Sequence, residues 1–230
     1  MATLDDKNSD CLVIFDLDGT LVNSSKQIEF CMNKTREDFG FSKLMPVDYL
    51  RLIGQPVESL ISDLTLSQDK VKVIVAQFRF LLRETIVKCG VQCFDNVADA
   101  FRRLEGLGVK SAVATTKPTD LALLTISHSC LRNFDIHVQG TDNFAPKPSP
   151  IVIEKILLKL QPKFALMVGD RIEDIEAAVK AGINSIGIAA GAHSFEELRK
   201  AGAIATFPDF ASFSKTIHSD PKGFKEYFKK

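Results

Sequence analysis

The feature that most constrains this chain is a series of short, almost continuous runs of apolar and β-branched residues. Five such runs occupy residues 11–15, 110–114, 134–139, 164–168 and 184–189. Strands read this way when helices cover both faces of a parallel sheet, because neither side of the strand meets water. Amphipathic helical patterns separate the later runs, at residues 97–107, 119–130, 149–160 and 173–181. The alternation predicts an α/β fold with a doubly wound, Rossmann-like parallel sheet.

The interval between the first and second predicted strands is too long for one crossover helix. Its sequence predicts several amphipathic helices instead, at Gln27–Phe39, Val47–Ile53 and Lys70–Lys88. We therefore expect two domains: an α/β core formed by residues 1–22 and 91–230, and a small helical cap domain formed by residues 23–90.

Charge and hydropathy exclude several classes of protein. The 230 residues include 29 Lys and Arg and 29 Asp and Glu, so no net positive charge favours nucleic acid or an anionic membrane. The first ten residues are polar and acidic, unlike a secretory signal, and no apolar run reaches the length of a membrane span. We expect a cytoplasmic protein that binds neither nucleic acid nor membrane.

The cysteines and the basic C-terminus carry weaker signals. The five cysteines are scattered without zinc-site spacing, which favours buried free thiols; they are Cys11, Cys31, Cys89, Cys93 and Cys130. The four histidines form no metal-binding pattern. Residues 222–230 are basic and mildly amphipathic, and we expect them to form a frayed, solvated tail.

Polar residues follow three of the predicted strands. Asp16 and Asp18 follow the first strand, and Asp170 and Asp174 follow the run at 164–168. Ligands bind beyond the carboxyl ends of strands in open α/β sheets, so we expect these groups to converge. Four neighbouring carboxylates require a cation, and oxygen ligands favour a hard ion, so the sequence predicts Mg²⁺ as cofactor.

Other polar residues supply donors for an anionic substrate. Thr115 and Thr116 end the second strand, and Lys147 lies in a proline-rich loop. A carboxylate nucleophile, a metal ion and donors for equatorial oxygens are what phosphoryl transfer requires. The sequence therefore predicts a phosphotransferase whose nucleophile is Asp16.

Four segments, in this order, resemble the motifs of the haloacid dehalogenase superfamily. They are DLDGT at 16–20, Thr115 after an apolar strand, Lys147 before a proline, and GDRIED at 169–174. The resemblance is greatest to the phosphoglycolate phosphatase-like branch, through VNSS, RLIGQPVESL, TTKP and KPSP at 22–25, 51–60, 115–118 and 147–150. Residues 23–90 look like the helical cap of that branch.

The resemblance implies a role for each matching residue. Asp16 would attack phosphorus to form an aspartyl phosphate, and Asp18 would act as general acid and base. Mg²⁺ would bind the Asp16 carboxylate, the backbone carbonyl of Asp18 and Asp170, with support from Asp174. Thr115 and Lys147 would hold phosphoryl oxygens. An acid at Asp18 disfavours dehalogenation, because the dehalogenating members lack one there.

The substrate is expected to be a small phosphorylated metabolite. Gly19, Thr20 and Thr116 are candidate phosphate- or substrate-binding positions, whereas Arg51 in the cap is either a substrate-binding cation or an exposed helix residue. Asn23, Thr116 and Arg171 depart from the usual pattern of the branch, which leaves the particular ester undecided.

Several alternatives to a phosphatase remain open at this point. They are a sugar phosphomutase of the same superfamily, an inorganic pyrophosphatase, a receiver-type phospho-acceptor domain and a catalytically idle binding protein. The protein is expected to be a monomer or a homodimer.

Overall fold

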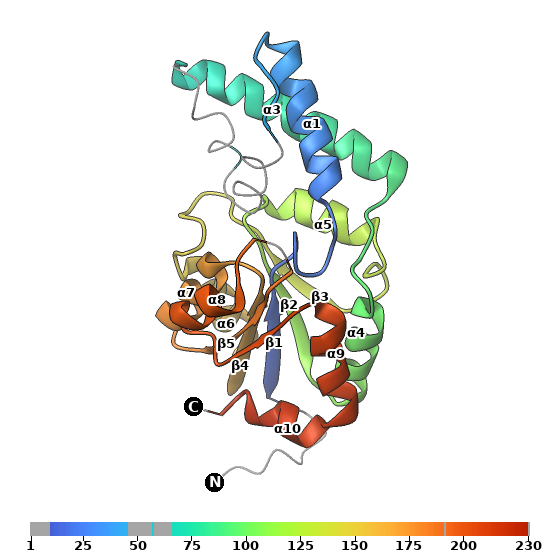
Figure 1. Cartoon of the computed structure of the whole chain (residues 1–230), viewed down its shortest axis with the longest axis vertical. Helices are drawn as coiled ribbons and strands as arrows, with labels where there is room; N and C mark the ends of the chain where they lie inside the picture. Colours follow the sequence, from blue (N-terminus) through green and yellow to red (C-terminus); the bar gives the residue numbers. More distant parts are fainter. Residues whose placement is uncertain (1–9, 46–56, 58–65, 191, 230) are drawn as a thin grey trace.

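A six-stranded parallel sheet forms the centre of the molecule (Figure 1). The computed structural model describes residues 10–45, 57, 66–190 and 192–229. The strands are β1 (Cys11–Phe15), β2 (Lys110–Ala114), β3 (Ile136–Gln139), β4 (Phe164–Gly169), β5 (Asn184–Ile188) and β6 (Ala205–Phe207). Their order across the sheet is β3-β2-β1-β4-β5-β6. The chain moves outward from β1 to β3 and then returns to place β4 beside β1, so the switch point of the topology lies between β1 and β4.

Helices cover both faces of the sheet (Figure 1). Those packed around it are α4 (Val97–Gly106), α5 (Thr119–Ser127), α6 (Ile151–Leu160), α7 (Ile172–Lys180), α8 (Phe195–Ala201), α9 (Phe210–Ser219) and α10 (Pro221–Glu226). The helices α1 (Ser25–Asp38) and α3 (Gln68–Cys89) pack on each other beyond the carboxyl ends of the strands.

The side chains of β1 alternate between two apolar clusters because successive strand residues point to opposite faces. Val13 and Phe15 belong to the cluster that contains α4, α9 and α10, whereas Leu12 and Ile14 belong to the cluster formed with α6 and α7. All residues of β1 are buried. The strand that carries Asp16 is therefore fixed from both sides.

The α/β fold and its parallel sheet are confirmed, and β1 and β2 have the predicted bounds. The sequence did not predict β6, α8, α9 or α10. The expectation of a frayed, solvated C-terminus was wrong. Phe224 and Phe228 are buried, and the Asn184 side chain donates to the carbonyls of Tyr227 and Lys229. Aromatic burial holds this segment to the core despite its basic composition.

The polypeptide leaves and re-enters the core through two adjacent segments. The N–H of Asn23 donates to the Gln92 carbonyl at 2.8 Å, and the N–H of Phe94 donates to the Leu21 carbonyl at 3.1 Å. Helices α1 and α3 lie between these segments in the chain and agree with the helices expected at 27–39 and 70–88. The expected helix at 47–53 and the residue Arg51 lie outside the described residues.

The cysteines differ from the sequence-based expectation. Cys93 and Cys130 form a disulfide, whereas Cys11 and Cys31 are free and buried and Cys89 is free and exposed. The N–H of Val91 donates to the His128 carbonyl at 2.8 Å, which brings the two disulfide segments together. A pair separated by 37 residues cannot be assigned from spacing, because the tertiary structure creates this proximity.

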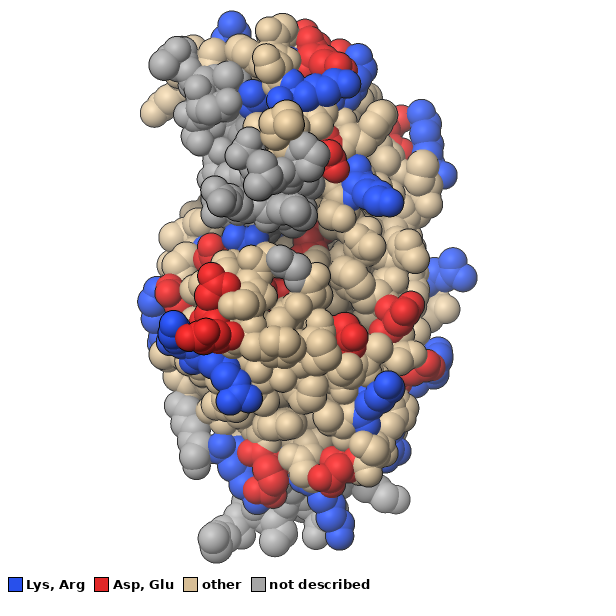
Figure 2. Space-filling view, viewed as in Figure 1, with Lys and Arg blue, Asp and Glu red and all other residues tan. Residues whose placement is uncertain are grey.

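Acidic and basic side chains are interspersed over the visible face of the molecule (Figure 2). Within the described part of the chain, the helices are too short or too polar to cross a lipid bilayer.

Candidate active site

The predicted carboxylates converge where the two central strands end. Asp16 follows β1 and Asp170 follows β4, and these strands are direct neighbours at the switch point of the sheet. The N–H of Asp16 donates to the Val168 carbonyl at 2.9 Å and so extends the pairing by one residue. Asp174 enters from the first turn of α7.

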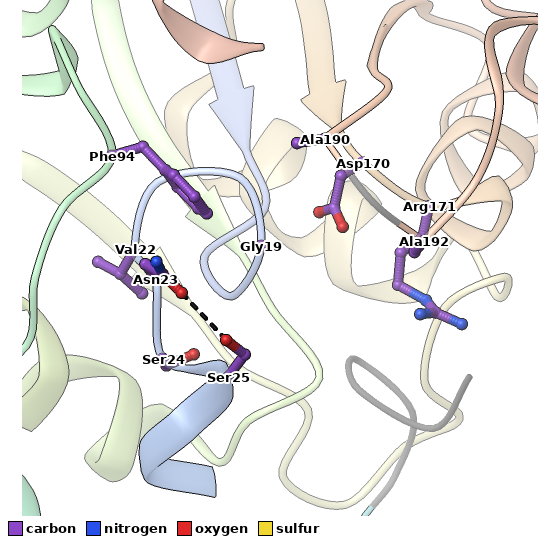
Figure 3. A pocket seen from close by; sticks show the side chains of 10 residues that line it. All are labelled: Gly19, Val22, Asn23, Ser24, Ser25, Phe94, Asp170, Arg171, Ala190 and Ala192. Atoms are coloured by element: carbon purple, nitrogen blue, oxygen red, sulfur yellow. Dashed lines mark hydrogen bonds between the residues drawn. The ribbon is translucent and has the colours of Figure 1, made fainter. Parts of the chain in front are cut away.

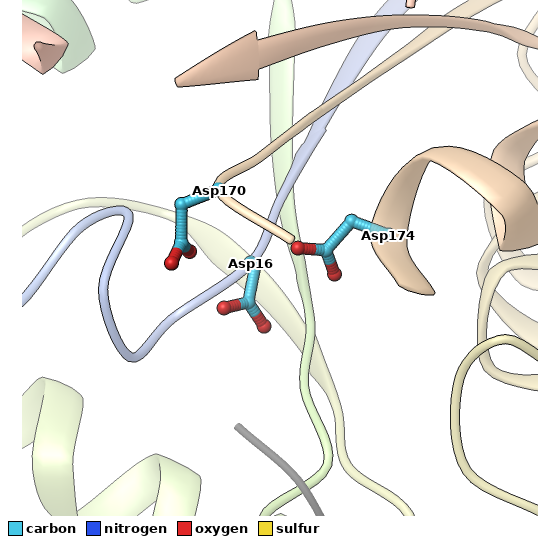
Figure 4. A group of neighbouring side chains, drawn as sticks. All are labelled: Asp16, Asp170 and Asp174. Atoms are coloured by element: carbon cyan, nitrogen blue, oxygen red, sulfur yellow. The ribbon is translucent and has the colours of Figure 1, made fainter. Parts of the chain in front are cut away.

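Asp16, Asp170 and Asp174 form a buried cluster that could hold a metal ion (Figure 4). Each contributes one carboxylate oxygen, and these oxygens lie within 4.8 Å of one another. Protein donors already engage both oxygens of Asp174: Lys147 donates to Oδ1 at 2.5 Å, and the N–H of Arg171 donates to Oδ2 at 3.1 Å.

Asp16 and Asp170 are engaged differently, since donors from the described part of the chain bind only one oxygen of each. Lys147 donates to Asp16 Oδ1 at 2.6 Å, and the Thr20 hydroxyl donates to Asp170 Oδ1 at 2.7 Å. No donor from the described residues reaches Oδ2 of either carboxylate. These two oxygens are thus better placed to bind a cation than those of Asp174.

Lys147 joins the carboxylate cluster to the end of β2. Besides Asp16 and Asp174, its ammonium group donates to the Ala114 carbonyl at 2.9 Å. The three donors of a lysine are therefore all used. This buried network fixes the loop that contains Lys147 against the ends of β1 and β2 and the first turn of α7.

The cluster carries more negative charge than Lys147 neutralises. Burial raises the pKa of Asp16 to about 7, and repulsion from Asp174 and Asp18 adds to the effect although Lys147 opposes it. Burial and repulsion from Asp16 and Asp174 also raise the pKa of Asp170 well above its ordinary value. Burial lowers the pKa of Lys147, but Asp16 and Asp174 outweigh this and raise it. A bound cation would offset the unfavourable ionisation of the carboxylates.

Asp18 lies outside this cluster and has different partners. Its Oδ1 accepts hydrogen bonds from the Ser24 hydroxyl and from the Lys117 ammonium group, and all three residues are buried. Ser24 and Lys117 were not predicted as site residues, although both lie in segments that carry the family resemblance, VNSS and TTKP. Their polar side chains within these matched segments were the sequence signal that could have identified them.

Gly19 allows the loop after β1 to turn close to Asp170. Its φ is +92°, a conformation that side chains disfavour, and an added Cβ would lie 2.6 Å from Asp170 Oδ2. The N–H of Gly19 donates to the Val22 carbonyl at 3.0 Å and closes the turn. Any other residue would displace the carboxylate.

The remaining predicted residues lie around the same crevice. Thr115 is buried after β2, and its hydroxyl accepts a hydrogen bond from the N–H of Lys117 at 3.2 Å, which leaves the hydroxyl proton for another acceptor. Thr116 is half-buried beside it.

A pocket of about 220 Å³ opens next to the carboxylates (Figure 3). Gly19, Val22, Asn23, Ser24, Ser25, Phe94, Asp170, Arg171, Ala190 and Ala192 line it. The pocket lies between the loop after β1 and the loops after β4 and β5. This volume lies below the range of about 300–1,000 Å³ that is usual for sites of drug-sized ligands, so the pocket suits a small metabolite.

Comparisons with known proteins agree with this geometry. The model of the haloacid dehalogenase-like hydrolase family matches residues 13–188. Phosphoglycolate phosphatase from Vibrio vulnificus (strain CMCP6) is 28% identical over 214 residues, which cover 88% of this chain and 92% of that protein. The probable phosphatase IndB from Dickeya dadantii (strain 3937) is 31% identical over 219 residues, which cover 90% and 94%.

The fold is also similar to solved structures. The crystal structure of a predicted phosphatase from Clostridium acetobutylicum superposes with a TM-score of 0.76 at 26% identity, covering 91% of this chain and 98% of that one. The matched family residues include most of β1, the whole of β4 and the carboxylates that follow these two strands. The chain therefore belongs to the haloacid dehalogenase-like hydrolase family and is an enzyme of its phosphatase type, similar to the phosphoglycolate phosphatases.

Proposed function

We propose that the protein is a Mg²⁺-dependent phosphatase that hydrolyses small phosphate monoesters through an aspartyl phosphate on Asp16. One observation carries the proposal. Two carboxylates separated by one residue have separate partners, since Lys147 binds Asp16 and Lys117 with Ser24 binds Asp18. One carboxylate thus belongs to the cation-binding cluster, whereas the other lies outside it and would serve as the acid and base.

The donor set fits a hard divalent cation. Asp16 Oδ2 and Asp170 Oδ2 would be its carboxylate ligands, together with the Asp18 backbone carbonyl, and Asp174 would support the site through Lys147 and the backbone of Arg171. When bound, Mg²⁺ would supply positive charge that allows the anionic nucleophile and an anionic phosphate to approach each other.

In the first step, a carboxylate oxygen of Asp16 attacks phosphorus and forms a new O–P bond. The bond from phosphorus to the ester oxygen breaks, and the carboxyl group of Asp18 gives its proton to the departing oxygen. The Thr115 hydroxyl would donate to a phosphoryl oxygen, whereas Lys147, whose three donors are already used, would stabilise the phosphoryl oxygens through its positive charge.

In the second step, water attacks the phosphorus of the aspartyl phosphate and transfers a proton to the Asp18 carboxylate. The O–P bond to Asp16 breaks, inorganic phosphate leaves, and both side chains return to their starting protonation states.

The substrate is proposed to be a compact ester of the phosphoglycolate kind. The small pocket supports this, as do relatives such as the Vibrio phosphoglycolate phosphatase. We also propose that residues 23–90 act as a cap domain on a core of residues 1–22 and 91–230. The adjacent linker segments at 21–23 and 92–94 support a hinge at that boundary.

The test is release of inorganic phosphate from phosphoglycolate by purified protein with excess Mg²⁺. Asp16→Asn should lower kcat by roughly 10³-fold or more, because the amide is a poor nucleophile. Asp99→Asn, at an exposed carboxylate on α4, is the matched control and should keep wild-type activity. Wild-type turnover in Asp16→Asn would refute the mechanism. Isomerisation of a sugar phosphate without phosphate release would instead identify a phosphomutase.

A further inference from the structure

Three of the five cysteines gather where helix α3 returns to the core. Cys89 ends α3, Cys93 follows in the returning linker, and Cys130 lies after α5 and is bonded to Cys93. Cys89 and Cys130 line an open pocket of about 660 Å³. This pocket shares no lining residue with the pocket at the carboxylates. Small solutes therefore have access to the disulfide from a side that the substrate does not use.

The two halves of the disulfide differ in their surroundings. Cys130 is exposed, whereas Cys93 is half-buried. The N–H of Cys130 donates to the sulfur of Cys93 at 3.3 Å. An attacking thiolate would therefore reach the sulfur of Cys130 first, and the N–H would stabilise the negative charge that develops on the departing sulfur of Cys93. Accessible disulfides are the ones that exchange readily with thiols.

The linker that contains Cys93 also forms part of the wall of the candidate active site. Phe94, the next residue, lines the pocket at the carboxylates, and so does Val22 (Figure 3). Val22 pairs with Cys93 in an antiparallel bridge, and the N–H of Phe94 donates to the Leu21 carbonyl at 3.1 Å. The disulfide ties the same linker to the segment after α5. A change in the disulfide can therefore reach the pocket wall across one peptide unit.

Resting on the proposed phosphatase function, we propose that the disulfide between Cys93 and Cys130 is a redox-controlled tether that fixes Phe94 in the pocket wall and thereby sets the affinity for substrate. A dithiol is the class of reductant that would open it.

In the first exchange, one thiolate of the dithiol attacks the sulfur of Cys130. A mixed disulfide forms, and Cys93 leaves as a thiolate that takes up a proton. The second thiolate of the dithiol then attacks its own partner sulfur in the mixed disulfide, and Cys130 leaves and is protonated in turn. The dithiol is oxidised to a disulfide, and the two cysteines are reduced.

Reduction removes the covalent link but not the hydrogen bonds around it. The N–H of Val91 still donates to the His128 carbonyl at 2.8 Å, and the pairing of Val22 with Cys93 needs no covalent bond. The fold should therefore persist while the linker gains freedom. A substrate that packs against Phe94 must then order this part of the wall when it binds, which raises KM more than it lowers kcat.

The experiment compares wild-type protein before and after reduction with dithiothreitol, with phosphoglycolate as substrate and excess Mg²⁺. The double variant Cys93→Ser and Cys130→Ser lacks the tether. Cys89→Ser removes the exposed thiol of the same pocket and is the matched control. Hydrogen exchange of residues 91–94 in metal-free protein measures the freedom of the linker without reference to activity. Thermal melting checks that each form is folded.

We expect reduction to raise the KM of wild-type protein by about threefold or more, as the ordering of one aromatic side chain and its linker allows, and to change kcat less. Exchange of residues 91–94 should become faster. Reoxidation with oxidised glutathione should reverse both effects. Cys89→Ser should respond as the wild type does, whereas the double variant should resemble the reduced wild type before and after treatment.

Three results would overturn the inference while leaving the phosphatase proposal in place. They are an unchanged KM or unchanged exchange on reduction, a response that disappears in Cys89→Ser, and loss of cooperative melting on reduction, which would make the disulfide a purely structural link. Absence of phosphate release from both the oxidised and the reduced protein would refute the phosphatase proposal instead, and the exchange measurement would then decide whether the tether exists.

Discussion

Asp16 and Asp18 show how much local environment decides the chemistry of identical side chains. Asp16 lies in a buried cluster with Asp170, Asp174 and Lys147, whereas Asp18 bonds to Ser24 and Lys117. The turn at Gly19 keeps the chain close to Asp170 and lets these neighbouring carboxylates serve separate networks. The proposed division into nucleophile and acid depends on this separation.

The raised pKa of Asp16 predicts how stability changes with pH. Burial raises its pKa from 3.8 to about 7, so the folded protein keeps this proton to a higher pH than the unfolded chain. Between about pH 4 and about pH 7 the folded state binds more protons, and the free energy of unfolding therefore falls as pH rises. Asp170 contributes in the same direction.

We expect metal-free wild-type protein to lose more thermal stability than metal-free Asp16→Asn between about pH 5 and about pH 8. The asparagine removes one of the two carboxylates that resist ionisation. Melting temperatures in excess chelator measure the difference. Equal losses in the two proteins would show that Asp16 ionises as easily when folded as when unfolded.

At the scale of elements, aromatic packing decides where the C-terminal helices lie. Phe15 of β1 contacts Phe101 of α4 and Phe213 of α9, with ring centroids 5.2 and 6.4 Å apart. Phe224 of α10 continues the cluster through Phe213, at 6.1 Å. A helix of six residues has little stability of its own, so its position depends on this contact.

Phe224→Ala should destabilise the protein by about 3–5 kcal/mol, because it leaves a cavity in the aromatic cluster. Phe195, which is 45% exposed at the start of α8, provides the matched control, and its replacement by alanine should cost less than about 1 kcal/mol. Urea unfolding measures both changes. Similar losses of unfolding free energy in the two variants would mean that the packing of α10 contributes no more to stability than an exposed side chain does.

For the whole molecule, the disulfide links the returning linker to the segment after α5. In the chain-entropy view, closing a loop between Cys93 and Cys130 restricts the unfolded state, and its loss should cost about 2–4 kcal/mol. The double variant Cys93→Ser and Cys130→Ser should therefore unfold at lower urea concentration than the oxidised protein. Thiol titration of the denatured, unreduced wild type should detect three thiols; detection of five would contradict the bridge.

Cation binding should stabilise the whole fold, because its proposed ligands follow two different strands. Asp16 and Asp18 follow β1, and Asp170 follows β4. At a Mg²⁺ concentration 100 times its dissociation constant, the gain is about 2.7 kcal/mol. Asp170→Asn should lose most of this gain, whereas Glu105→Gln, at an exposed acid on α4, should keep it. A melting temperature of wild-type protein that does not respond to Mg²⁺ would argue against the site.

The sequence by itself determined the α/β class and the edge of the sheet at which the polar residues gather. Continuous apolar runs and helical periodicity are local patterns, and neighbouring parallel strands end on the same side of a sheet, so Asp16, Thr115 and Asp170 could be grouped from the sequence alone. Lys147 was predicted from its charge in a proline-rich loop and from the resemblance of that loop to a family motif, and the structure joins it to Asp16 and Asp174.

Only the tertiary structure decided which groups touch. The bonds from Lys117 and Ser24 to Asp18, the disulfide between Cys93 and Cys130, and the burial of Phe224 each join segments whose proximity no local pattern encodes. The pocket that brings Asn23 together with Arg171 arises in the same way. Such contacts depend on how helices and loops pack on the sheet, and packing is a property of the whole chain rather than of any segment.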